Sequence, residues 1–171
     1  LRTGGVAWRQ SLVEFGLMFL LFARYAGQSP PAVNEAHYLA KAKHYWNPSW
    51  CAGDLFLESA DAHLTFYWTL GWLTAVLPLP AVAWCGRIVS WLVLALGWQR
   101  LSSLVAPWRW LSLLSAGLWL ALIDYGAMAG EWVVGGVEAK CLAYGCVLLA
   151  LAALQRDRWS TALIMLGVAT A

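Results

Sequence analysis

Long apolar runs separated by short polar stretches divide this chain from end to end. The runs lack the strict alternation of apolar and polar positions that predicts half-buried strands, and a segment that crosses a lipid bilayer must satisfy its backbone hydrogen bonds internally. The pattern therefore predicts an all-α fold, a polytopic bundle of transmembrane helices that forms a single transmembrane domain over residues 1–171. We expect spans at about residues 10–27, 81–99, 108–125 and 139–155, and a further span from residue 160 onward.

One further run, His63–Leu79, is harder to place. It ends in the stretch AVLPLP, residues 75–80, whose two prolines break a helix. Positive charges favour the cytoplasmic face, so all three pairs of arginines should lie on that side of the membrane. This is possible only if the chain crosses the membrane twice between the first pair and the second. In that topology the run lies at the interface or re-enters, and residues 28–80 and 126–138 are outer loops. In the competing topology the run crosses fully and the N-terminus lies outside, and charge counting does not separate the two. The three pairs are Arg2 and Arg9, Arg100 and Arg109, and Arg156 and Arg158.

Composition supports a membrane location. Hydrophobic residues make up 61% of the chain and charged residues 12%, whereas soluble domains are typically about 25% charged. The 13 tryptophans fit the same interpretation, because indole rings favour the headgroup region. We therefore expect an integral, multi-pass protein of a plasma or inner membrane, with membrane lipids as partners. The sequence begins at Leu1 and stops inside an apolar run, and we interpret it as an N-terminal fragment.

The charge and the cysteines argue against a nucleic-acid-binding protein and against a protein held together by disulfides. The net charge of +2 is small and the basic residues are scattered, so no nucleic-acid partner is expected. The four cysteines form no CxxC pair and no recognisable disulfide framework, so we expect inert packing thiols.

The stretch PPAVNEAHYLAKAKHYW, residues 30–46, predicts a juxtamembrane amphipathic helix in the first outer loop. Asn34 suits the N-cap, and the charge of Glu35 would complement the helix dipole in the first turn. At 100° per residue Glu35 falls in the middle of the apolar face, so an acid is held against the protein or the membrane. A plainer interpretation is an interfacial helix whose Lys41 and Lys43 meet lipid phosphates. A third is a metal site built from His37, His44 and His63.

A second acid, Glu138, directly precedes the span expected at residues 139–155 and follows the flexible pair Gly135-Gly136. The plain interpretation is a helix-start carboxylate with Lys140 as a snorkelling lysine. The first topology, however, places Glu35 and Glu138 on the same outer face. Two acids that face one polar cavity would suit a general base and a residue that orients the substrate.

The order of these features resembles the GT-C superfamily of polytopic membrane glycosyltransferases, in particular the protein-mannosyltransferase and aminoarabinose-transferase-like branch. The resemblance rests on VNEAHYLAKA after the first span, on LPLPAVAWCGRIVSWLVLALGWQRL, and on GGVEAKCLAYGCVLLALAALQRDRW. Two departures stand out. Asn34 occupies a position where many members have a carboxylate, and Asp61-Ala62-His63 lacks the prolines of a His-Pro-Pro run.

The resemblance implies transfer of a sugar from a polyprenyl-phosphate donor to an acceptor at the outer face, with inversion at the sugar carbon. Glu35 would be the catalytic base or position it, and Glu138 would orient the acceptor or a divalent metal ion; whether a metal takes part is left open. Substrate-binding residues would be Asn34, Tyr38 and His63, with Lys41, Lys43 or Lys140 at the lipid phosphate.

Two other classes stay open. A transporter would use Glu35, Asp124 and Glu138 to line a substrate or proton path. A non-catalytic membrane subunit would need these acids only for stability.

Overall fold

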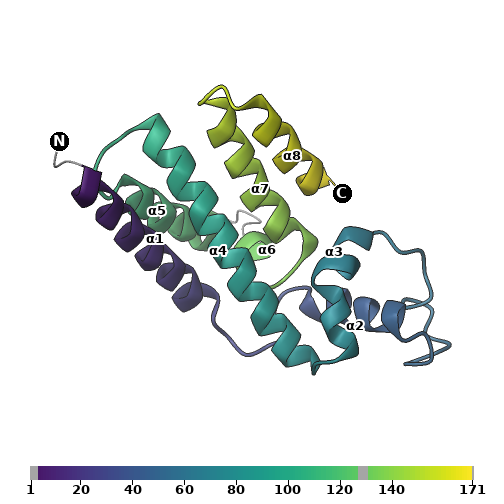
Figure 1. Ribbon diagram of the computed structural model, residues 1–171. Helices are drawn as coiled ribbons and strands as arrows, with labels where there is room; N and C mark the ends of the chain where they lie inside the picture. Colours follow the sequence, from purple (N-terminus) through teal and green to yellow (C-terminus); the bar gives the residue numbers. More distant parts are fainter. Residues whose placement is uncertain (1–3, 127–130, 171) are drawn as a thin grey trace.

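The computed structural model describes residues 4–126 and 131–170, and these residues form helices and connecting loops without a β-strand. The all-α prediction is confirmed over this part of the chain (Figure 1). The elements are α1 (Gly4–Ala26), α2 (Glu35–Trp46), α3 (Leu64–Thr69), the 3-10 helix η1 (Gly71–Ala75), α4 (Leu79–Val105), α5 (Leu111–Gly126), α6 (Glu131–Val134), α7 (Ala139–Leu154) and α8 (Trp159–Thr170).

Among the described residues, one helix is both long and apolar enough to cross a membrane. This helix is α4, whose 27 residues extend for about 40 Å. The apolar helices α5, α7 and α8 have 16, 16 and 12 residues, fewer than the roughly 20 that a straight crossing requires. Length and apolar composition together therefore identify one candidate crossing, since α1, with 23 residues, is long enough but does not meet the same standard of apolar composition.

Three helices, α1, α4 and α5, pack side by side with alternating direction. The Gln99 side chain donates a hydrogen bond to the Ser11 carbonyl near one end of α1, and Arg87 reaches the Ala26 carbonyl at its other end, so α1 and α4 are antiparallel. Helix α5 runs parallel to α1, because its first residues contact Glu14 and Asp124 near its end bonds Tyr25. Buried apolar side chains fill the space between the three, among them Met18, Phe22, Trp91, Leu94 and Leu120.

Helix α7 lies against α4 and runs in the same direction. Gly86 faces Val137, and eleven residues later Gly97 faces Gly145, where a Cβ atom on Gly97 would come within 2.8 Å of the Gly145 carbonyl oxygen. Glycine is needed at this crossing because the two backbones touch. Helix α8 returns along α7 after the turn at residues 155–158.

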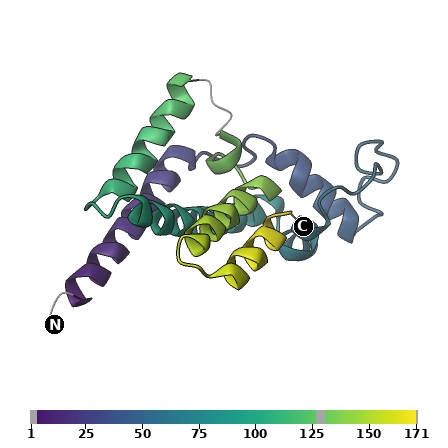
Figure 2. The same cartoon turned by 90° about the horizontal axis from the view of Figure 1, so that it is seen from above.

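These directions give the bundle two distinct ends (Figures 1 and 2). We call the end that holds residues 106–110 and 155–158 the turn end. We call the end that holds residues 27–78 and 131–138 the α2 end. Helix α2 and the loop after it project from the bundle on the side away from the N-terminus (Figure 2).

The run His63–Leu79 is not one helix. It is divided into α3, with six residues, and η1, with five, which meet at Leu70. Pro78 and Pro80 then begin α4, where proline in the first turn is tolerated because no N–H is needed there. Both short elements lie at the α2 end, so the run does not connect the two ends of the bundle.

Candidate functional site

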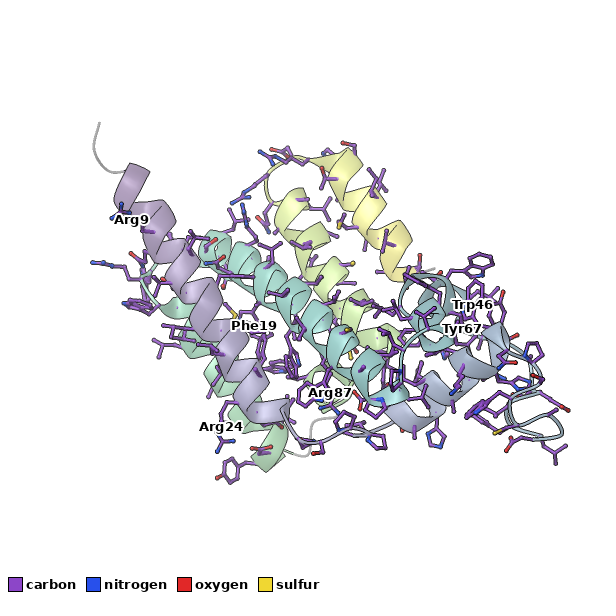
Figure 3. All side chains as sticks on the ribbon, turned by 60° about the horizontal axis from the view of Figure 1, so that its bottom comes forward. Arg9, Phe19, Arg24, Trp46, Tyr67 and Arg87 are labelled. Atoms are coloured by element: carbon purple, nitrogen blue, oxygen red, sulfur yellow. The ribbon has the colours of Figure 1, made fainter. Side chains whose placement is uncertain are left out.

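A buried ion pair joins the start of α2 to the middle of α4. Arg87 Nε donates to Glu35 Oε1 at 2.6 Å, and Arg87 Nη2 donates to Glu35 Oε2 at 2.6 Å. Both side chains are completely buried. This two-pronged geometry is the strongest arrangement of arginine with a carboxylate. Arg87 lies where α4 passes the C-terminal end of α1 (Figure 3).

Glu35 also accepts two backbone hydrogen bonds. The N–H of Ala32 bonds Oε2 at 2.8 Å, and the N–H of Val137 bonds Oε1 at 2.8 Å. A carboxylate offers about four acceptor positions, so the four hydrogen bonds use all of them. We call Glu35, Arg87 and the Val137 N–H the clamp, because they fix α2, α4 and the segment before α7 to one another.

The third nitrogen of the guanidinium group extends the clamp to α1. Arg87 Nη1 donates to the carbonyl oxygens of Ala26 and Gln28, and the group lies 4.9 Å from the centre of the Trp84 ring. The sequence analysis missed Arg87. Its signal was an arginine inside the apolar run at residues 81–99, where a charge is costly unless it is paired within the protein.

Gly136 lets the segment before α7 approach Glu35. A Cβ atom at this position would lie 2.9 Å from the Ala32 carbonyl oxygen and 3.0 Å from Glu35 Cγ. The predicted flexible pair Gly135-Gly136 is therefore a place of close packing at Gly136, which is buried. The close approach brings the Val137 N–H within hydrogen-bonding distance of the carboxylate.

Glu138, the next residue, is completely buried at the N-cap of α7. Neither of its carboxylate oxygens accepts a hydrogen bond of normal geometry from the described residues, and Lys140 Nζ lies 3.9 Å from Oε2. Burial raises the pKa of Glu138 above its ordinary value, while Lys140 and the side chain and backbone amide of Asn34 pull it back in part. Asn34 occupies the N-cap position of α2, as predicted, but its side chain makes no capping hydrogen bond there.

A pocket of about 270 Å³, which we call the α2 pocket, lies between α2, the loop after it and α3, and Glu138 is not among the residues that line it. Asn34 and Tyr38 form the wall nearest Glu138, since both interact with its charge. The rings of Tyr38 and His63 are 4.9 Å apart. Burial raises the pKa of Tyr67 to about 12, so its phenol stays protonated and can donate a hydrogen bond. The other polar residues of the pocket are His37, Lys41 and Ser59.

Lys41 is turned toward the loop after α2. Its Nζ donates to the carbonyl oxygens of Phe56 at 3.1 Å and Ser59 at 2.7 Å, and to Ser59 Oγ at 2.9 Å. His44 Nδ1 lies 2.8 Å from the Trp50 carbonyl oxygen in the same loop. The face of α2 that carries Lys41 and His44 is thus covered by this loop, and both side chains are buried. Lys43 lies apart, over the ring of Trp50 at 4.9 Å.

A second pocket, of about 290 Å³, lies between α3, the start of α7 and the end of α8, and we call it the α8 pocket. His63 lines both pockets, which therefore adjoin. Lys140, half exposed, lines the α8 pocket with apolar neighbours that include Leu142 and Val168. Of the predicted site residues, Asn34, Tyr38 and Lys140 interact with Glu138, and Lys41 and His63 line the α2 pocket together with Asn34 and Tyr38. Glu35 and Lys43 are engaged elsewhere.

Among the described residues, no three His, Cys, Asp or Glu side chains converge as metal ligands. The three histidines considered for a metal are dispersed: His37 is exposed, His44 is bound to the loop, and His63 stacks with Tyr38. We therefore derive no step through a metal ion.

Comparisons with protein-family models, with curated proteins and with solved structures gave no match. Function is therefore inferred from the side chains of the site.

Proposed function

We propose that this chain is part of a membrane-embedded glycosyltransferase of the GT-C type, which transfers a sugar from a polyprenyl-phosphate donor to an acceptor hydroxyl at the outer membrane face. One observation carries the proposal. Glu138 is a completely buried carboxylate whose oxygens accept no hydrogen bond of normal geometry from the described residues. Its neighbours Asn34 and Tyr38 line the α2 pocket, at one end of a bundle whose helices are apolar outside.

The distribution of apolar and charged residues supports a multi-pass arrangement. Side chains on the outward faces of three helices are between 55% and 67% exposed although they are strongly apolar. Glu35, Arg87 and Glu138 are completely buried instead. This reversal of the usual surface suits a lipid environment, where a large apolar surface has no cost. The outward residues are Leu12 and Leu20 on α1, Leu114 and Leu118 on α5, and Leu163 and Ile164 on α8.

The two ends of the bundle support an orientation. Exposed tryptophans lie at both ends, Trp68 and Trp72 at the α2 end and Trp108 and Trp159 at the turn end, as in an aromatic belt. The turn end also carries a group of arginines, which favours a cytoplasmic location for it and an outer location for the α2 end. The arginines are Arg9, Arg100, Arg109, Arg156 and Arg158.

Glu138 suits the role of general base. The acceptor hydroxyl oxygen would attack the anomeric carbon, its proton would pass to the Glu138 carboxylate, and the bond from the carbon to the phosphate oxygen would break. The electron pair of that bond leaves with polyprenyl phosphate. A base with a raised pKa holds the proton more firmly, and the polar residues Asn34 and Tyr38 would hold the acceptor in the α2 pocket.

Glu35 is assigned a positioning role in this proposal. Its four hydrogen bonds leave no acceptor position for a substrate proton. Through the Val137 N–H it holds the backbone next to Glu138. We therefore propose Glu138 as the base instead of Glu35, with Glu35 and Arg87 acting through the backbone.

The α8 pocket is assigned to the donor. Its apolar wall suits an isoprenoid chain, and Lys140 would meet the phosphate as a point charge. Lys41 is not assigned to the phosphate, because four oxygen atoms of the loop already surround its ammonium group.

Neither alternative class gains a specific observation. A transporter would need acids spread along a path through the bundle, whereas Glu35 and Glu138 are buried at the α2 end and Asp124 is exposed at the same end. A non-catalytic subunit would gain little from a buried acid whose burial raises its pKa despite Asn34 and Lys140, since such a group destabilises the fold.

The proposal is tested with Glu138→Gln in the full-length protein, in membranes that contain the endogenous acceptors. Release of polyprenyl phosphate from synthetic donors carrying mannose or aminoarabinose is measured. Loss of at least a hundredfold of the release rate, with unchanged amounts of folded protein, is expected. Glu58→Gln, an exposed acid in the loop after α2, is the control. Unchanged release in Glu138→Gln would overturn the assignment of the base.

A further inference from the structure

A cavity of about 550 Å³ lies away from the α2 and α8 pockets. It opens between the C-terminal turns of α1 and α5 at the α2 end, and Arg24 and Asp124 both line it. Figure 3 shows Arg24 at this end of α1, beside the end of α5.

The polar part of this cavity carries one charge of each sign. Arg24 and Asp124 are both exposed, and no ion pair within 4 Å joins them among the described residues. The Tyr25 hydroxyl donates to Asp124 Oδ1 at 2.8 Å, which fixes the carboxylate and leaves Oδ2 for a ligand. A ligand that spans the cavity would therefore meet a guanidinium group with one part and a carboxylate with another.

The rest of the cavity is apolar and continues onto the outer surface. Apart from Gln28, the remaining lining residues are apolar or glycine, and they include Leu21, Gly117, Leu120 and Ala121 on α1 and α5. The cavity is open at Gly117, because a Cβ atom at this position would have one neighbour within 4 Å, the Leu21 side chain at 3.9 Å. The neighbouring outward side chains of the same helices, Leu20 and Leu118, are exposed. The cavity is therefore continuous with the surface assigned to lipid.

We propose that this cavity binds a zwitterionic phospholipid with a primary ammonium group. The phosphate would pair with Arg24, the ammonium group would donate to Asp124, and an acyl chain would lie along Leu21, Gly117 and Ala121. The inference rests on the membrane placement in the proposed function, but not on sugar transfer.

Native mass spectrometry of the full-length protein, extracted from vesicles that contain equal amounts of phosphatidylethanolamine, phosphatidylcholine and phosphatidylglycerol, tests the site. We expect retention of phosphatidylethanolamine at least fivefold above the other two, lost in Arg24→Gln and in Asp124→Asn. Arg100→Gln, an exposed arginine at the turn end, is the control and should retain it. Soluble phosphoethanolamine at millimolar concentration should not displace the lipid, because it lacks the acyl chain.

Three results would overturn the inference: equal retention of all three lipids, retention unaffected by both substitutions, or displacement by phosphoethanolamine. If the protein retains phosphatidylethanolamine but has no transferase activity, the lipid site is supported and the proposed function is contradicted. The reverse result, activity without preferential retention, would remove the lipid site alone.

Discussion

Arg87 on α4 donates hydrogen bonds to both carboxylate oxygens of Glu35 at the start of α2, 52 positions earlier in the chain. Neither side chain is exposed to solvent. The pair therefore sets how the first long loop docks on the bundle, and through the Val137 N–H it also sets where α7 begins.

Removal of Arg87 should destabilise the protein severely. Arg87→Ala leaves the Glu35 charge buried and unpaired, with an expected loss of about 3–5 kcal/mol in the free energy of unfolding. Denaturant unfolding in detergent micelles, followed by circular dichroism, measures the change.

Two further variants sharpen this test. Arg100→Ala, on an exposed part of the same helix, should change stability by less than about 0.5 kcal/mol. The double variant Glu35→Leu with Arg87→Met removes the unpaired charge and should recover a minor part of the loss. Recovery is limited because the N–H groups of Ala32 and Val137 lose their hydrogen bonds to Glu35. Equal stability of Arg87→Ala and Arg100→Ala would contradict the clamp.

Gly136→Ala should be destabilising by about 1–3 kcal/mol, since the new methyl group would overlap the Ala32 carbonyl oxygen and the Glu35 side chain. Gly16→Ala is the matched control. A Cβ atom at Gly16 has no neighbour within 4 Å, and alanine in a helix is favoured over glycine, so this variant should be neutral or more stable. Thermal midpoints of the two variants give the comparison, and the same sign for both would count against the close approach at Gly136.

Stability should depend on pH through Glu138. Its folded-state pKa is raised above the ordinary value of 4.5, chiefly by burial, so the folded protein binds the proton more tightly than the unfolded chain. The stabilising contribution is full below pH 4.5 and is lost as the pH rises through the folded-state pKa. Thermal midpoints from pH 4 to pH 8 should therefore fall less steeply in Glu138→Gln than in the wild type. A parallel pair of curves would show that Glu138 titrates normally.

Lys41→Met should release the loop after α2. The ammonium group holds the Phe56 and Ser59 carbonyl oxygens, and hydrogen bonds to a charged group contribute about 1.5–3 kcal/mol. Protease cleavage between residues 47 and 63 should therefore accelerate at least tenfold. Lys43→Met is a control on the same helix, and it loses only a contact with the ring of Trp50 in the loop. This variant should be cleaved at nearly the wild-type rate.

Helices were the part of the fold that the sequence could predict. Apolar runs and proline positions located α1, α4, α5, α7 and α8, and Asn34 with Glu35 located the start of α2. The bounds of α5 and α7 lie within three residues of those expected, whereas α1 begins six residues earlier and α4 ends six residues later than expected. Helix α4 is longer because it continues through the polar residues Arg100, Ser102 and Ser103, which apolar runs do not include. Periodicity could not reveal that α2 has two covered faces, since the loop that covers Lys41 and His44 has no periodic pattern of its own.

The candidate site was predicted in part. Asn34, Tyr38, His63, Lys140 and Glu138 do come together, although residues 34 and 138 are far apart in the chain. The interpretation of Glu35 could not have been refined without a structure. Its partner depends on the packing of α4 against α1 and α7, a long-range relationship that no local spacing records.

The clamp also constrains the order in which the protein can be made. Glu35 and Arg87 leave the ribosome well before Val137, whose N–H supplies one of the four hydrogen bonds to the carboxylate. Synthesis proceeds from the N-terminus, so α4 must enter its surroundings while that bond is still missing. The ion pair of Arg87 and Glu35 would then connect the first loop to α4 early in synthesis. When Gly136 and Val137 emerge, the Val137 N–H would complete the four hydrogen bonds and bring Glu138 to its buried position in the same step.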